Sequence, residues 1–158
     1  MVSPEPGPPA LAMVPASSDH GAMDGDRPVA LIVAFDHATR ASVGGWMEAA
    51  GFEVELCTGP TRPGYRCVAD TAGDCPLTHD ADLVILDAWL ASDADDEGAV
   101  APGLVRFYRS RGLPLIVLDH GREAPALIIR ERTALIEWPP NRRELQHMAQ
   151  ALVADRSG

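Results

Sequence analysis

Apolar residues recur along this chain in short runs, and the spacing within each run predicts an element of secondary structure. The continuous apolar run at residues 29–35 is typical of a strand that is buried on both faces of a sheet. Segments rich in apolar residues and of strand length also occupy residues 52–57, 81–86, 113–118 and 134–138. Apolar residues at helical spacing fill the intervals 43–50, 104–108 and 145–152. Gly51 and Gly112 follow the first two of these intervals, where glycine commonly ends a helix.

Strands that alternate with helices predict an α/β fold. The crossovers between them favour a doubly wound, flavodoxin-like parallel sheet of five strands in the order 2-1-3-4-5. Sites in such folds lie at the carboxyl ends of the strands, where Asp36, Asp87, Asp119 and Trp138 fall. One interval departs from the pattern. The prolines and glycines of residues 58–78 predict that a Cys/Pro/Gly loop replaces the second helix.

Composition sets the limits of the domain and of its partners. Residues 1–27 hold five of the 14 prolines and no periodic apolar face, which predicts a disordered tail before a domain at 28–155. The net charge of -10 argues against nucleic acid and anionic membranes as partners. All 13 basic residues are arginine, so a P-loop or a catalytic lysine is excluded. Short apolar runs and a first basic residue at Arg27 predict a soluble, cytoplasmic protein.

Four segments at the strand ends resemble the receiver domain of bacterial response regulators, over roughly residues 29–154. The resemblance rests on Leu31–Arg40, on Leu83–Asp87, on Leu113–Leu118 and on Ile136–Pro139. It implies a signalling domain of two-component systems in which Asp87 stands at the phosphoacceptor position. It also implies that partners, and a possible second copy of the chain, bind the face of strand 4, strand 5 and the last helix.

The departures from the family pattern concern its chemistry. Receivers hold Mg²⁺ with an acidic pair and the phosphoacceptor, because a hard cation needs several oxygen ligands. Here the pair positions hold Ala34 and Phe35, the hydroxyl position holds Asp119, and the lysine position holds Trp138. We therefore expect no Mg²⁺ and no cation to assist phosphorylation of Asp87. These substitutions predict a pseudo-receiver that is regulated by something other than ordinary phosphotransfer.

The acidic residues at the strand ends leave alternatives open. Asp36, Asp87 and Asp119 are either separately solvated, which we favour, or members of one acidic pocket, in which Asp87 and Asp119 would approach each other most closely. His120 beside Asp119 suggests an acid–base pair. A small flavodoxin-like enzyme that uses Asp87, Asp119 and His120 is the competing function, and conventional phosphotransfer through Asp87 is a third. No nucleophile with an adjacent base is evident, so we expect no enzyme.

The predicted loop contains a possible metal site. Cys57, Cys67, Cys75 and His79 provide ligands for zinc or for an iron–sulfur cluster, although their spacing is longer than that of zinc fingers. A disulfide that senses redox state and three unlinked thiols are the alternatives.

Charge differs between the two parts of the chain. Residues 1–105 hold 17 acids and four arginines, and residues 106–143 hold eight arginines and four acids. Arginine pairs well with carboxylates of another protein, so the arginine-rich part is a candidate contact face. Nothing after residue 154 resembles an output domain. We therefore expect a stand-alone receiver-like protein that acts through protein–protein contacts, with the cysteine loop as a metal-binding or redox-sensitive element.

Overall fold

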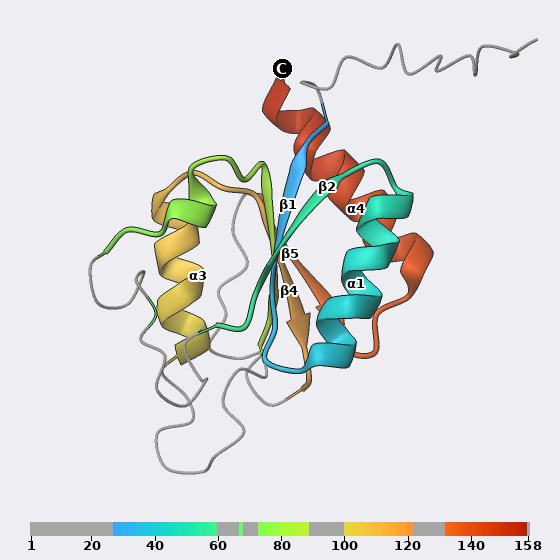
Figure 1. Ribbon diagram of the computed structural model, residues 1–158, viewed down its shortest axis with the longest axis horizontal. Coiled ribbons are helices and arrows are strands. Elements are labelled where there is room, and N and C mark those ends of the chain that lie inside the picture. The colour runs from blue at the N-terminus through green and yellow to red at the C-terminus, as the bar shows by residue number, and fades with distance from the viewer. Residues whose placement is uncertain (1–26, 60–66, 68–72, 89–99, 122–131, 158) are drawn as a thin grey trace, which may run out of the picture.

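The helices and strands of the computed structural model follow the order that the apolar pattern predicts (Figure 1). The structure describes residues 27–59, 67, 73–88, 100–121 and 132–157. The strands are β1 Val29–Val33, β2 Glu53–Cys57, β3 Leu83–Asp87, β4 Leu115–Asp119 and β5 Thr133–Glu137. The helices are α1 His37–Ala49, α3 Val100–Ser110 and α4 Arg142–Ala154, with short 3₁₀ turns η1 Pro76–Thr78 and η3 Asp155–Ser157.

The strands form one parallel sheet in the order β2-β1-β3-β4-β5, as predicted. Strand β1 lies between β2 and β3, and the register pairs Ile32 with Leu56 on one side and with Ile85 on the other. Strand β4 lies between β3 and β5, and this register places Asp87 opposite Leu118. The carboxyl ends of β3 and β4 are therefore adjacent at one edge of the sheet.

Two apolar layers cover the two faces of the sheet. Helices α1 and α4 lie together on one side, and α3 lies on the other (Figure 1). Alternate residues of the central strands point to opposite layers, as strand geometry requires. Ile32 and Ile85 pack with Met47 of α1 and Leu145 of α4, whereas Leu31 packs toward the α3 side. Both faces of the central strands are buried, which explains their continuous apolar runs.

Local sequence signals begin and end the helices. Asp36 is the N-cap of α1, and Asn141 is the N-cap of α4. Gly51 follows α1 at φ 94°, and Gly112 follows α3 at φ 70°, a backbone conformation that glycine adopts without strain. The apolar run from residue 29 to 35 is longer than β1, because the chain leaves the sheet at Ala34 to reach this cap.

Parts of two predictions lie outside the described residues. They are the disorder of residues 1–26 and the conformation of 60–66 and 68–72 in the cysteine loop. Within the part of the chain that the structure describes, no helix has the length and apolar character needed to cross a membrane.

Candidate functional site at the carboxyl edge of the sheet

The phosphoacceptor-position residue Asp87 ends β3 and is 3% exposed. His120 follows directly after β4, the neighbouring strand, and Nε2 of its ring lies 2.5 Å from Oδ1 of Asp87. Both side chains are largely buried: counted for the side chain alone, the exposed fraction is 4% for Asp87 and 12% for His120. A buried hydrogen bond between a carboxyl group and an imidazole therefore joins the ends of β3 and β4.

Trp138, which the resemblance aligned with the lysine of receivers, completes this arrangement from a third strand end. Its ring stacks on His120, with ring centroids 4.7 Å apart and an interplanar angle of 20°. The backbone N–H of Trp138 donates to the carbonyl oxygen of Asp119 at 2.8 Å, which holds the end of β5 against the end of β4. Trp138 offers no charge, as expected, but it packs against the imidazole that contacts Asp87. We call Asp87, His120 and Trp138 the β3–β5 rim cluster.

The structure corrects the expected partner of His120. His120 contacts Asp87 rather than Asp119, because the Oδ1 atom of Asp119 accepts a hydrogen bond of 2.9 Å from Gly121 N–H and so closes the turn after β4. The pairing of β3 with β4 in the sheet brings His120 to Asp87.

Asp36 lies apart in role from this cluster. The favoured expectation that the three acids are separately solvated is wrong for Asp87 and Asp119, which end strands of the sheet and are only 3% and 8% exposed. Its Oδ2 atom accepts hydrogen bonds from Thr39 N–H at 2.7 Å and from the Thr39 hydroxyl at 3.0 Å, which caps α1. These bonds, with the nearby charge of Arg40, hold the pKa of the exposed Asp36 carboxyl below its usual value. A capping role accounts for Asp36 without any ligand.

The role of Arg40 was not predicted. Its Nη1 atom donates to the carbonyl oxygens of Ala34 and Phe35, both at 2.6 Å. A guanidinium group therefore binds the backbone at the end of β1, at the two residues that the resemblance aligned with the acidic pair of receivers. Only the folded path from β1 into α1 brings Arg40 back to these carbonyls.

The three cysteines pack against one apolar layer. Cys67 is buried, and Cys57 and Cys75 are partly buried against the layer on the α3 side of the sheet. None of them is in a disulfide. Burial raises the pKa of the Cys57 thiol, and the neighbouring thiols of Cys67 and Cys75 raise it further, although a hydrogen bond from Gly59 N–H acts in the opposite direction. The fold thus places three thiols from distant parts of the loop near one another.

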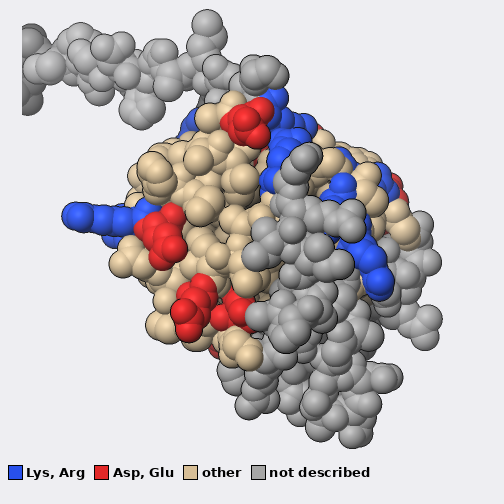
Figure 2. Space-filling view, turned by 180° about the vertical axis from the view of Figure 1, so that it is seen from behind, with Lys and Arg blue, Asp and Glu red and all other residues tan. Residues whose placement is uncertain are grey.

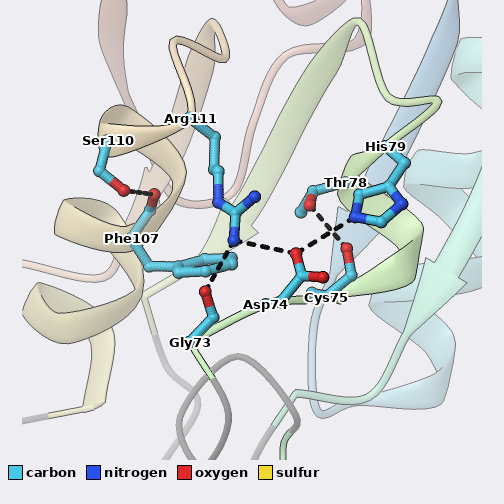
Figure 3. A network of polar contacts seen from close by, with 8 residues as sticks. All are labelled: Gly73, Asp74, Cys75, Thr78, His79, Phe107, Ser110 and Arg111. Carbon is cyan, nitrogen blue, oxygen red and sulfur yellow. Dashed lines mark hydrogen bonds and ion pairs between the residues drawn. The ribbon is translucent and has the colours of Figure 1, made fainter.

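His79 does not join these thiols. Figure 3 shows its ring beside Asp74, with Nε2 at 3.2 Å from Oδ1. Nη2 of Arg111, at the end of α3, reaches the same Asp74 oxygen at 2.9 Å and the Gly73 carbonyl at 2.7 Å (Figure 3). The hydrogen bond with His79 and the charge of Arg111 lower the pKa of the exposed Asp74 carboxyl. The segment from Gly73 to His79 is thereby attached to α3.

No metal site is assembled by these side chains. Within the described ranges, no three His, Cys, Asp or Glu residues form a group that could hold a metal ion. His79, the expected fourth ligand, is instead engaged with Asp74. Zinc or iron–sulfur binding at Cys57, Cys67 and Cys75 stays a prediction, and it would require a different arrangement of this segment.

Comparison with known proteins identifies the class of fold. No protein-family model matches the sequence, and no curated protein matches it. Solved structures do match. A response regulator receiver domain protein from Clostridium thermocellum has a TM-score of 0.59 and 13% identity, and the match covers 82% of this chain and 97% of that one. A response regulator receiver protein from Sinorhizobium medicae has a TM-score of 0.58 and 14% identity, over 83% and 98%.

A third match is the receiver domain of a Francisella response regulator, with a TM-score of 0.57, 15% identity and coverage of 84% and 100%. These likenesses, together with the five-stranded parallel sheet and its strand order, establish that the chain has the fold of a receiver domain. The fold alone does not specify a function, so the chemistry at the carboxyl ends of the strands follows from the side chains that lie there.

Proposed function

We propose that this chain is a receiver-like signalling domain that acts through protein–protein contacts and does not depend on ordinary aspartyl phosphorylation. The observation that carries the proposal is the hydrogen bond between His120 and the buried Asp87. A phosphoacceptor must present a carboxylate oxygen to the phosphoryl donor. Oδ1 of Asp87 is instead bonded to an imidazole that Trp138 packs against.

The surrounding residues support the same proposal. Phosphoryl transfer depends on positioned cations that neutralise the charge of the transferred group, and Mg²⁺ needs several oxygen ligands. At the end of β1, the guanidinium of Arg40 is bonded to the carbonyls of Ala34 and Phe35, where the family has carboxylates. Asp119, at the hydroxyl position, uses a carboxylate oxygen to close its own turn, and a second negative group there would repel a phosphoryl group.

Treatment of the full chain with acetyl phosphate and Mg²⁺ tests the proposal, with intact mass as the measurement. We expect no phosphoryl adduct on the wild-type protein. His120→Ala exposes Asp87 to the reagent and is still expected to remain unmodified, because Ala34 and Phe35 supply no carboxylates to complete the ligand set of the metal. A receiver domain with the complete family motif serves as the positive control. An adduct on the wild type that disappears in Asp87→Asn would make this a conventional phosphotransfer receiver.

The same buried pair favours a second candidate function, the small enzyme considered above. A histidine hydrogen-bonded to a carboxylate is the base and its orienting group in many hydrolases. The candidate needs a serine, threonine or cysteine nucleophile within reach of His120, whereas the contacts that the structure describes for its ring are with Asp87 and Trp138. The signalling function therefore has the stronger support.

For the contact face, we infer that arginine side chains bind carboxylates of a partner protein or of a second copy of the chain. Arg142 and Arg143 are exposed in the first turn of α4, on the expected face. The guanidinium group of arginine forms paired hydrogen bonds with carboxylates, and complementary charge speeds the association of two proteins.

We also propose that the three cysteines respond to redox state or to a soft metal. Their common packing against the α3-side layer supports this, since thiols that lie near one another can form a disulfide after a modest rearrangement. The oxidant would be a peroxide or a small disulfide, and the products would be one intramolecular disulfide and the reduced oxidant.

The raised pKa of Cys57 gives a pH-dependent prediction. Alkylation requires the thiolate, and a raised pKa keeps the thiol protonated to a more alkaline pH than in a free cysteine. At about pH 8, slightly below the ordinary thiol pKa, we expect iodoacetamide to modify Cys57 more slowly in the native protein than in the protein unfolded in urea. The difference between the two rates should become smaller as the pH rises. Peptide mass spectrometry measures the rates, and equal rates in the native and unfolded chains would contradict the prediction.

A further inference from the structure

Arg132 lies at the amino edge of the sheet, opposite the β3–β5 rim cluster. It immediately precedes β5, and its φ of 64° is unusual for a residue with a side chain. The N–H of Leu115 donates to its carbonyl oxygen at 2.9 Å, and its own Nη1 donates to the carbonyl oxygen of Gly112 at 3.2 Å. Both the backbone and the side chain of Arg132 are therefore held against the turn between α3 and β4.

The other edge of this guanidinium group is buried without a partner. Nε and Nη2 of Arg132 are inaccessible to solvent and have no hydrogen-bond partner among the described residues. The hydroxyl oxygen of Thr133, the next residue, is in the same situation. Buried donors that lack an acceptor are costly, and a buried charge without a counter-charge is more so. Three such atoms on two consecutive residues require an explanation.

The geometry of the guanidinium group indicates what is missing. Nε and Nη2 form the side of arginine that donates two parallel hydrogen bonds to a carboxylate or a phosphate group. Nη1 is occupied by Gly112, so the orientation of this side is fixed before any ligand arrives. Figure 2 shows arginine side chains in the upper part of the molecule, the end at which the strands begin in Figure 1, with acidic side chains both beside and below them.

We propose that Arg132 is the anchor of an oxyanion-binding site at the amino edge of the sheet. The Nε–Nη2 side of its guanidinium donates two hydrogen bonds to one phosphate or carboxylate group. Binding supplies acceptors to two donor atoms that otherwise lack them. This site is independent of the function proposed for Asp87 and His120, which lie at the other end of the strands.

The test observes the proposed atoms directly. Nitrogen-15 NMR of the full chain follows the arginine Nε–H signals during titration with sodium phosphate, with sodium acetate and with sodium chloride at matched ionic strength. We expect one Nε–H signal, assigned to Arg132 by its loss in Arg132→Lys, to move and saturate with phosphate or with acetate but not with chloride. Movement with phosphate alone identifies a phosphate site, and movement with acetate alone identifies a carboxylate site.

Arg132→Gly separates binding from folding. Glycine adopts a φ of 64° without strain, so this variant keeps the backbone and loses the guanidinium. The anion that moves the NMR signal should raise the midpoint temperature of thermal unfolding of the wild type. This increase should be lost in Arg132→Gly, whose affinity for the anion should be at least about tenfold weaker. Arg111→Gln is the matched control. Arg111 directly precedes Gly112, the residue that Arg132 contacts, but its guanidinium is already paired with Asp74. Its anion affinity should change by less than about twofold.

Two results overturn the proposal. The first is an Arg132 Nε–H signal that no oxyanion moves beyond the effect of chloride. The second is an equal anion-dependent thermal shift in the wild type and in Arg132→Gly, which would show an adventitious ion effect only.

Discussion

His120→Ala is expected to lower the free energy of unfolding by about 3 kcal/mol, because it removes the imidazole partner of a buried carboxyl group. Asp87 is 3% exposed, so water has little access to replace the lost hydrogen bond. The substitution also removes the ring that stacks on Trp138 and leaves a space beside it. Urea denaturation at neutral pH, followed by circular dichroism, measures the change.

His147→Ala is the matched control, because His147 is exposed on α4, and its effect should stay within about 0.5 kcal/mol. A double-mutant cycle with Asp87→Asn isolates the pair: the second substitution should cost much less when the first is already present. Additive effects, or equal effects of the two histidine substitutions, would show that the contact between His120 and Asp87 contributes nothing to stability.

Leu31→Ala is expected to lower the free energy of unfolding by about 3 kcal/mol through loss of buried apolar contacts and the cavity left behind. Leu31 is fully buried in β1 between two neighbouring strands, and its side chain packs in the layer on the α3 side. The cost arises because the surrounding strands cannot close over the space. The same denaturation measurement applies.

Leu56→Ala supplies the comparison with the same chemical change. Leu56 lies in the edge strand β2 and is 50% exposed, so its truncation should cost less than about 1 kcal/mol. If both leucine substitutions proved equally mild, the two-layer packing around the sheet would be wrong.

The strands and their order were predictable because the relevant forces are local and repetitive. A strand buried on both faces needs an uninterrupted apolar run, and residues 83–86 and 115–118 have that character. Right-handed crossovers then limit the strand orders to a few. The boundaries were less certain, since Phe35 is apolar yet lies outside β1, where the capping of α1 by Asp36 determines the path of the chain.

The candidate site was predictable in its location and not in its contacts. The sequence placed Asp87, Asp119 and Trp138 at the carboxyl edge, and the structure has them there. It also suggested His120 as an acid–base residue, but with Asp119 as its partner. Neighbours in sequence point their side chains in different directions at the end of a strand, whereas residues on adjacent strands can meet. The partner of His120 therefore depended on strand adjacency.

The sequence by itself determined the parallel α/β architecture and the absence of lysine chemistry, because composition and periodicity express these properties directly. Tertiary structure alone decided that His120 binds Asp87, that Arg40 binds the end of β1, and that Arg132 presents two buried donors without an acceptor. The physical reason is the range of the interactions: hydrogen bonds act over a few ångströms, and only folding brings residues tens of positions apart within that distance.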